Sequence, residues 1–279
     1  MSLQSGARLG DKVAIVTGGS RGIGERIAFE LAQNGAKVGA FQLPCIKVER
    51  QISSHVIKVS ITYTSAGSEA RLNDLIQRVN ALDNGSSAIG VKADLRDPAS
   101  PAKIVTETIQ HFGEHIDILV NNAGVELVKP LQEITVADFG FVYDLNVRAP
   151  MLMLQSVLPY LRAPGRIINI GSVGGRYGFK QLSVYCSSKS ALEGLTRCWA
   201  AELGLSGHTV NCVNPGPVQT ELMDNIPKET IAMQKSQTPI QNRIGTVEDI
   251  APVVVWLASE ESKWITGQVV SASGGWAMY

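Results

Sequence analysis

The chain has 279 residues, of which 44% are hydrophobic and 18% charged, and its 25 Lys and Arg balance its 25 Asp and Glu. This composition supplies a sizeable core, and the balanced charge gives no electrostatic surface for nucleic acid or an anionic membrane. No apolar run approaches the roughly 18 residues that a membrane span needs, and residues 1–8 lack the apolar centre of a signal peptide. We therefore expect a cytoplasmic globular protein with no nucleic-acid or membrane partner.

Short apolar runs alternate along the chain with helical patterns. The first predicted strand, 12–17, stops at Gly18-Gly19, and a helical pattern then runs from Ile23 to Asn34. Further strands are predicted at 56–63, 88–92, 116–120, 166–170, 209–213 and 268–272, and helices at 68–82, 98–112, 136–161, 182–203 and 247–257. This order predicts an α/β fold, a Rossmann-type doubly wound parallel sheet with helices on both faces. Because no Pro/Gly-rich linker divides the chain, we expect one domain over 1–279.

One segment departs from this alternation. Residues 36–41 begin like a second strand, 42–55 lose periodicity, and the strand-like run 56–63 follows. Unstructured loops beyond about 12–15 residues are uncommon in compact domains. Removing 39–58 would join 36–38 to 59–63 as one strand of ordinary length. The segment 39–58 is therefore either a surface insertion or the product of a translated intron or gene-model error.

The turn after the first strand has the sequence Thr17-Gly-Gly-Ser-Arg-Gly-Ile-Gly24. Its glycines allow a tight turn and a close approach of the backbone to a pyrophosphate, which the free N–H groups of the following helix then bind. The spacing is Gly-x-x-x-Gly-x-Gly rather than Gly-x-Gly-x-x-Gly. Taken alone, such a cluster is also compatible with a turn that only reverses the chain.

Six motifs in order make the chain resemble the short-chain dehydrogenase/reductase family, in its single-domain branch, over nearly the whole length outside 39–58. They are the glycine turn, Asn-Asn-Ala-Gly at 121–124, Asn146, Ser172, the Tyr-x-x-x-Lys pair Tyr185 and Lys189, and Pro215-Gly216 with Thr220. The local pattern is most similar to fungal 3-ketoacyl and hydroxynaphthalene reductases. The resemblance implies an oxidoreductase that transfers hydride between a nicotinamide cofactor and a small-molecule ketone or secondary alcohol, such as a ketoacyl, polyketide or aromatic substrate.

The resemblance also implies the catalytic residues Asn146, Ser172, Tyr185 and Lys189. Tyr185 would donate a proton to the carbonyl oxygen, Ser172 would hydrogen-bond the same oxygen, and Asn146 would support a water relay to Lys189. Tyr185 and Lys189 lie four residues apart and so share one helix face. We expect the ammonium to lower the phenol pKa from its ordinary value of about 10. Taken alone, the pattern Tyr-x-x-x-Lys is also typical of the polar face of an ordinary amphipathic helix.

Cofactor-binding residues follow from the same resemblance. They are Gly18, Ser20, Arg21, Gly22, Ile23, Gly24, Tyr63, Thr64, Ser65, Asp94, Leu95, Asn122, Ala123, Gly124, Tyr185, Lys189, Pro215, Gly216, Val218 and Thr220. Asp94 would contact adenine, although a solvated loop carboxylate is the alternative. Neither possible second strand ends in an acid that could bind the ribose 2′-hydroxyl of NAD, and Arg21 is placed to pair with a phosphate. The charges therefore favour NADP(H).

The remaining patterns concern metals and assembly. The four cysteines, expected to be buried, and the four histidines, expected at the surface or in caps, show no metal-ligand spacing, so we expect no metal. Helices 136–161 and 182–203 carry apolar residues on more than one side, among them Leu154, Val157 and Trp199. In this family, the apolar residues that such helices do not bury in their own chain pack against a second subunit related by twofold symmetry. The resemblance therefore implies a homotetramer or at least a homodimer.

Two alternatives to a working enzyme stay open at this point. One is an NADP-binding regulatory or assembly protein without turnover. The other is a folded product that the segment 39–58 inactivates by displacing the second strand. The intact Ser172, Tyr185 and Lys189 favour the enzyme, since a regulator need not keep them.

Overall fold

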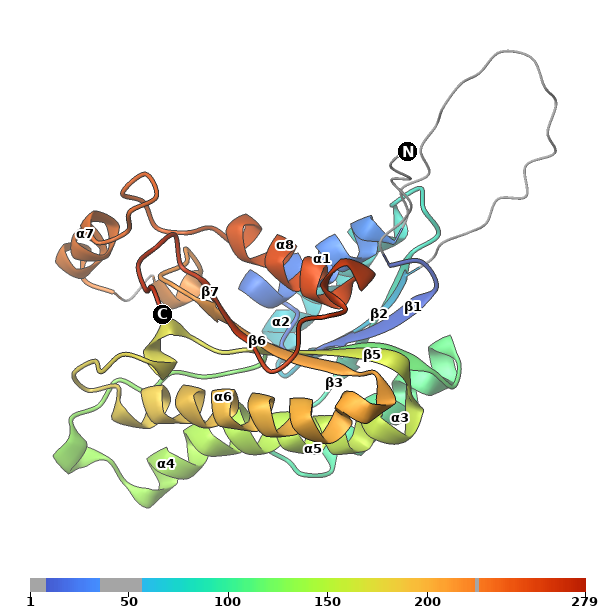
Figure 1. The fold of residues 1–279 in the computed structure, drawn as a ribbon, viewed down its shortest axis with the longest axis horizontal. Helices are drawn as coiled ribbons and strands as arrows, with labels where there is room; N and C mark the ends of the chain where they lie inside the picture. The colour runs from blue at the N-terminus through green and yellow to red at the C-terminus, as the bar shows by residue number, and fades with distance from the viewer. Residues whose placement is uncertain (1–8, 36–56, 224–225) are drawn as a thin grey trace, which may run out of the picture.

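Seven parallel strands form one open sheet in the computed structural model, which describes residues 9–35, 57–223 and 226–279 (Figure 1). The strands are β1 (Lys12–Val16), β2 (Ile57–Tyr63), β3 (Ser87–Lys92), β4 (Ile116–Asn121), β5 (Leu161–Ile170), β6 (Thr209–Pro215) and β7 (Val269–Ala272). Their order in space is β3-β2-β1-β4-β5-β6-β7, and every neighbouring pair is parallel. Strands β2 and β3 lie on one side of β1 and β4 to β7 on the other, so the order in which the chain adds strands reverses between β1 and β4. This confirms the predicted doubly wound sheet.

Helices cover both faces of the sheet (Figure 1). They are α1 (Gly22–Asn34), α2 (Ala66–Asn80), α3 (Ser100–Phe112), α4 (Val136–Tyr143), α5 (Ala149–Val157), α6 (Ser183–Leu203), α7 (Lys228–Ser236) and α8 (Val247–Ala258). Buried side chains of α1, α2 and α8 form one core with the sheet, and those of α3, α5 and α6 form the other. Leu154, Val157 and Trp199 are buried in this second core. These three residues therefore pack within the chain, and the expected contact with a partner subunit stays a prediction.

The predicted helix 136–161 is interrupted in its middle. Residues Asp144–Arg148 form a π-helical turn, closed by a hydrogen bond from the N–H of Ala149 to the carbonyl of Asp144. Pro150 follows, and it has no amide hydrogen to give to the carbonyl of Asn146 four residues earlier. The regular hydrogen-bond ladder is therefore broken at Asn146. The last residue of the predicted helix, Leu161, already belongs to β5.

The second strand is the later of the two strand-like runs. Ile57 is fully buried and lies in register with Lys12 of β1. Residues 36–56 lie outside the described residues, and so does the alternative second strand at 36–41. Ile57 and Lys58 are part of β2, so excision of 39–58 would preserve this strand only if Lys37 and Val38 took their places.

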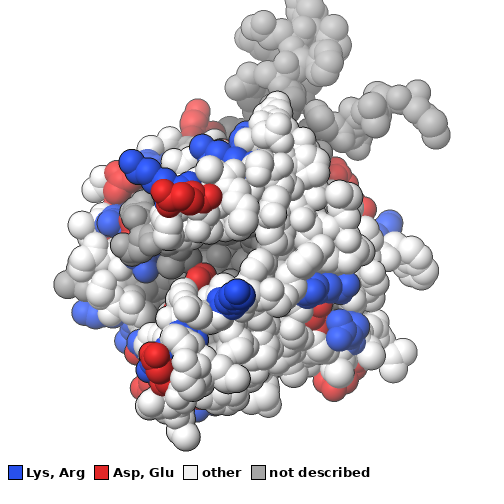
Figure 2. Space-filling view, turned by 90° about the vertical axis from the view of Figure 1, so that its left-hand side faces the viewer, with Lys and Arg blue, Asp and Glu red and all other residues white. Residues whose placement is uncertain are grey.

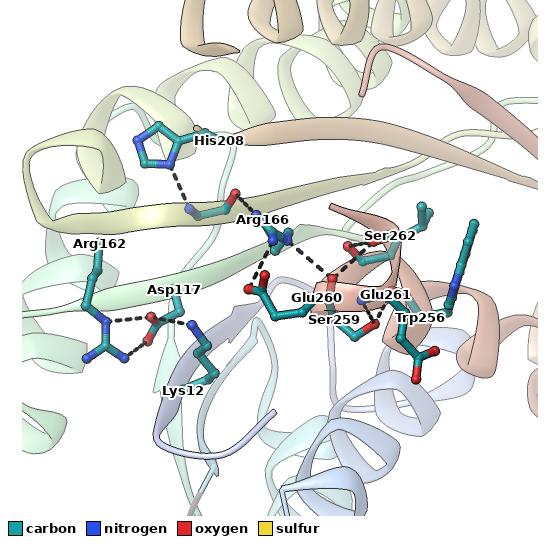
Figure 3. A network of polar contacts seen from close by, with 12 residues as sticks. Lys12, Asp117, Arg162, Arg166, His208, Trp256, Ser259, Glu260, Glu261 and Ser262 are labelled. Carbon is teal, nitrogen blue, oxygen red and sulfur yellow. Dashed lines mark hydrogen bonds and ion pairs between the residues drawn. The ribbon is translucent and has the colours of Figure 1, made fainter. Parts of the chain in front are cut away.

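Polar contacts hold the amino-terminal ends of the central strands together (Figure 3). The buried carboxylate of Asp117 accepts hydrogen bonds from the backbone N–H of Val13 at 2.8 Å and from the guanidinium of Arg162 at 2.8 and 3.0 Å. His208 is buried rather than a surface or capping residue, and its Nδ1 accepts the N–H of Gly165 at 2.8 Å. Ligands of open α/β sheets bind at the opposite, carboxyl ends of the strands. We therefore assign this network to stability.

Two other expectations concern cysteines and metals. Cys186 and Cys212 are buried, but Cys198 is exposed, so the expectation of burial is wrong for Cys198; Cys45 lies outside the described residues. The described part of the chain contains no group of three or more His, Cys, Asp or Glu suited to holding a metal ion. Within the same residues, no helix has the length and apolar character needed to cross a membrane.

Candidate active site

The glycine turn between β1 and α1 is packed too closely for side chains. Gly18 has a φ of +63°, and a Cβ there would lie 2.9 Å from the Cα of Ala123. A Cβ at Gly24 would lie 2.3 Å from Nδ2 of Asn122 and 2.5 Å from the carbonyl oxygen of Gly18. The N-cap residue of α1, Arg21, makes no side-chain capping hydrogen bond, so the first N–H groups of this helix stay available to a ligand. This backbone cradle fits a pyrophosphate.

Two side chains join this turn to the end of β4. Asn122 donates from Nδ2 to the carbonyls of Thr17 at 2.9 Å and Gly18 at 3.1 Å. Thr17 Oγ1 accepts the N–H groups of Asn122 at 2.9 Å and Ala123 at 3.0 Å. Asn122 was predicted as a cofactor residue, and the structure places it as a brace of the glycine turn. Thr17, which shares that bracing, was not among the predicted site residues, although it opens the same motif.

The loops after β2 and β3 border the same end of the sheet. Tyr63 ends β2, Thr64 follows it, and Ser65 is the N-cap of α2, accepting the N–H of Ser68 at 3.3 Å. Asp94 lies beyond β3, next to buried Leu95, and receives Nε and Nη2 of Arg96 at 3.0 and 2.9 Å. The hydrogen bonds from Arg96 lower the pKa of this carboxyl group. The acid expected at adenine is therefore already ion-paired.

Residues after β6 close the site from the other side. The N–H of Gly216 donates to the carbonyl of Ala272 at 3.1 Å, which ties the Pro215-Gly216 turn to β7. Val218 is buried and forms a bridge with Gly245. A Cβ at Gly22 would lie 3.5 Å from Cγ2 of Thr220. The glycine turn and the segment after β6 are therefore in contact. Figure 2 shows charged side chains of both signs around a hollow on this side of the molecule.

The four residues predicted to be catalytic come from three elements and meet at this end of the sheet. Tyr185 and Lys189 lie on α6, and Ser172 follows β5. A Cβ at Gly174 would lie 3.3 Å from Ser172 Oγ and 3.5 Å from Cε1 of Tyr185, so the two side chains are neighbours. Lys189 is 5% exposed, its Nζ donates to the carbonyl of Ile170 at 2.8 Å, and it lies 5.8 Å from the ring centroid of Tyr185. Ser172 Oγ also accepts the N–H of Gly174 at 3.0 Å.

Asn146 lies in the π-helical turn and holds the loop after β4. Its Oδ1 accepts the N–H of Val125 at 2.9 Å, and its Nδ2 donates to the carbonyl of Val125 at 2.9 Å and to Ser188 Oγ at 3.0 Å. This fixes Gly124, where a Cβ would lie 3.4 Å from Nζ of Lys189. The Asn146 side chain therefore positions the backbone beside the amine.

Burial dominates the ionisation of the phenol and the amine. It raises the pKa of Tyr185 to about 12; the hydrogen bond with Ser172 works against this rise, and the nearby carboxylate of Glu126 adds to it. Burial lowers the pKa of Lys189 to about 8. The prediction of a lowered phenol pKa is wrong for this structure, because desolvation of the phenolate is the largest contribution and raises it.

A polar network behind Ser172, centred on buried Asn214 and Glu193, was missed from the sequence. The N–H of Ser172 donates to Asn214 Oδ1 at 3.0 Å, and Asn214 Nδ2 donates at 2.7 Å to both Glu193 Oε1 and Tyr279 Oη. Arg176 Nε donates to Glu193 Oε2 at 2.8 Å. These residues come from distant segments, and no local pattern connects them. They fix the backbone that presents the serine.

Known proteins resemble this chain over most of its length. A family model described as "Enoyl-(Acyl carrier protein) reductase" matches residues 46–277, and one described as "short chain dehydrogenase" matches residues 12–59. Dehydrogenase OXI1 of Cochliobolus heterostrophus is 45% identical over 80% of this chain and 98% of its own. Hydroxynaphthalene reductase-like protein Arp2 of Metarhizium acridum is 34% identical over 96% of this chain and 95% of its own.

A solved structure gives a similar result. A blue fluorescent protein from a metagenomic library, in complex with NADPH, is 36% identical and has a TM-score of 0.83. The match covers 97% of this chain and all of that chain. The two proteins are therefore similar in amino-acid sequence as well as in fold.

The close packing at Gly24 gives a test of the cradle. Gly24→Ala should weaken binding of NADPH and NADH alike by roughly tenfold, because overpacking costs about 1–3 kcal/mol and must displace Asn122 or Gly18. The measurement is titration of nucleotide fluorescence. Gly178→Ala is the matched control, since a Cβ there meets nothing within 4 Å. Equal affinity in both variants would show that the turn is not the cradle.

Proposed function

The chain belongs to the short-chain dehydrogenase/reductase family, and we propose that it is an NADPH-dependent carbonyl reductase or, in reverse, an alcohol dehydrogenase. Family membership makes it an oxidoreductase with a nicotinamide cofactor and confirms the resemblance seen in its motifs. The observation that carries the proposal is the meeting of Ser172, Tyr185 and buried Lys189 at the cofactor end of the sheet.

Each of these residues has a distinct role in the proposed reaction. The bound nicotinamide, when reduced, supplies the hydride that the carbonyl carbon needs. The raised pKa of about 12 keeps the Tyr185 phenol protonated at neutral pH, which is the form that donates to the carbonyl oxygen during reduction. Ser172 Oγ hydrogen-bonds the same oxygen and orients it. Lys189 binds the nicotinamide ribose.

A route for returning the proton involves Asn146. Its side chain is engaged with Val125 and Ser188, so it is a poor binding site for a relay water. Its main-chain carbonyl lacks the α-helical partner that Pro150 would otherwise supply. We assign the proposed water relay toward Lys189 to this carbonyl.

Charges around the adenosine end support NADPH. Residues 63–65, which run from the end of β2 to the N-cap of α2, carry no acid that would repel a 2′-phosphate. Arg21 is 62% exposed at the start of α1. The similar metagenomic protein was solved with NADPH.

The rim of the site supports a flat or aromatic ketone as substrate. Tyr177 and Phe179 follow the Ser172 segment, are partly exposed, and contact the ring of Trp276 with centroids 5.4 and 5.7 Å apart. The related protein Arp2 is named as hydroxynaphthalene reductase-like, and hydroxynaphthalene is an aromatic compound.

We also propose that the protein is a homotetramer. The apolar residues that support this are Leu131, Val136, Phe139, Phe141 and Leu158, all exposed on and around α4 and α5. Single apolar residues scattered over a surface are normal, but several exposed ones close together are typical of a protein–protein interface. A monomer at micromolar concentration in sedimentation would contradict the assembly without touching the proposed chemistry.

The experiment for the reaction itself is a panel of ketones with NADPH, followed by loss of the reduced nicotinamide. It should be run on the full chain and on a chain lacking 39–58. Turnover by the full chain supports the proposal. NADPH binding without turnover of any ketone would favour a regulator. Loss of binding in the full chain, restored by the deletion, would identify that segment as inactivating.

The lowered pKa of Lys189 predicts a pH dependence for reduction. Below pH 8 the amine carries its charge and stabilises the phenolate that Tyr185 becomes after donating its proton; above pH 8 the charge is lost. The kcat/KM for the best ketone should therefore fall as pH rises through about 8. Thermal melts over the same range control for unfolding. A flat profile to well above that value would contradict the role of the ammonium.

Arg21 gives the test of cofactor preference. Arg21→Ala should raise the KM for NADPH by roughly tenfold and leave that for NADH nearly unchanged, because only NADPH has the phosphate that the guanidinium binds. Arg26→Ala is a matched control on the same helix, where the side chain pairs instead with Glu30 and Glu248. Equal losses with both cofactors would refute the phosphate contact.

A further inference from the structure

Three charged side chains from distant parts of the chain meet beside the glycine turn. Glu221 Oε2 accepts Nη1 of Arg21 at 2.9 Å, and Glu221 Oε1 accepts Nη1 of Arg71. Arg21 is the N-cap of α1, Arg71 lies on the second turn of α2, and Glu221 directly follows Thr220 after β6. The carboxylate therefore bridges two guanidinium groups, one at each oxygen.

The two arginines resemble a phosphate-binding site in which the Glu221 carboxylate takes the place of the phosphate. Guanidinium groups bind the oxygens of carboxylates and phosphates in the same way. Two arginines and one glutamate leave one positive charge unbalanced, so a dianionic phosphate would neutralise the pair better than the carboxylate does. The side chains of Arg21, Arg71 and Glu221 are 62%, 52% and 47% exposed. Ion pairs this exposed are weak, which makes the carboxylate displaceable.

The location of the pair matches the adenosine ribose in the proposed function. Arg21 belongs to the turn that would cradle the pyrophosphate. Arg71 belongs to α2, whose N-cap Ser65 lies just beyond the end of β2, where the ribose 2′-position is bound in this type of fold. Thr220 contacts the glycine turn, which brings Glu221 to the same edge.

We propose that Arg71 is a second arginine for the 2′-phosphate of NADPH, and that Glu221 competes with this phosphate for Arg21 and Arg71. The proposal rests on the NADPH-dependent function proposed above and adds a specificity residue and an internal competitor to it. Glu221 thereby reduces NADPH affinity and has little effect on a nucleotide without the 2′-phosphate.

The ionisation of Glu221 agrees with this competition. Its partial desolvation raises the pKa of the carboxyl group, but the hydrogen bonds and charges of Arg21 and Arg71 outweigh this and hold the pKa below its ordinary value. The group is therefore charged at neutral pH, where it opposes an incoming phosphate.

Adenosine 2′,5′-bisphosphate and adenosine 5′-monophosphate test the proposal on the full chain without catalysis. Glu221→Gln should tighten the bisphosphate about two- to fivefold, and Arg71→Gln should weaken it about two- to fivefold, the range expected for exposed charge pairs. Neither change should alter the Kd of the monophosphate. Competition against bound NADPH fluorescence measures both ligands.

Matched controls separate a local contact from a change in net charge. Arg78→Gln removes an arginine two turns further along α2 that pairs with Glu25 and Asp74. Glu248→Gln removes a glutamate that pairs with Arg26. If Arg71→Gln matches Arg78→Gln, or Glu221→Gln matches Glu248→Gln, the inference is overturned. Weaker NADH binding in Glu221→Gln would also overturn it, since the carboxylate would then read the ribose hydroxyl.

The double variant Arg71→Gln with Glu221→Gln tests the coupling. The gain from Glu221→Gln should shrink when Arg71 is already absent, because one of the two contested contacts is gone. An undiminished gain would place the competition elsewhere. Equal losses with NADPH and NADH in Arg21→Ala would contradict the NADPH function itself. A loss confined to NADPH in that variant, with silent Arg71→Gln and Glu221→Gln variants, would contradict this inference alone.

Discussion

Burial of the Lys189 amine at the carboxyl end of β5 is the constraint around which the site is built. Its Nζ donates to the carbonyl of Ile170, and the missing side chain at Gly124 leaves room for it. Asn146 keeps Gly124 in place through two hydrogen bonds to Val125. Desolvation lowers the pKa of the amine and raises that of the neighbouring Tyr185. At neutral pH the pair is therefore an ammonium and a protonated phenol, which suits proton donation to a carbonyl.

The topology explains why the cofactor cradle and this pair share one edge. The strand order reverses between β1 and β4. In open α/β sheets, the loops that leave the two strands at such a reversal go to opposite faces, and ligands bind in the crevice between them. The glycine turn follows β1, and the segment holding Asn122 and Gly124 follows β4. Thr17 and Asn122 tie the two loops together. Ser172 reaches the same crevice from β5, the next strand in the sheet.

Local patterns were sufficient for the strands and for the residues of the motifs, because buried parallel strands and their glycine turns leave strong signals. The short helix α7 was not predicted. The π-helical turn at Asn146 was missed, although Pro150 was a visible sign of it. The contacts of Asn214 with Glu193 and Tyr279, and of Glu221 with Arg21 and Arg71, were out of reach, because they join segments far apart in the chain. The prediction of a lowered pKa for Tyr185 was also wrong, since the spacing of two residues on a helix does not show how deeply they are buried.

The most direct test of the chemistry is removal of one hydroxyl group. Tyr185→Phe keeps the ring and should bind NADPH like the unchanged chain, while single-turnover reduction of the best ketone falls at least about a hundredfold, the smallest loss expected when a general acid is removed. Undiminished ketone reduction in this variant, with nucleotide binding intact, would contradict proton donation by the phenol and the function assigned to the site.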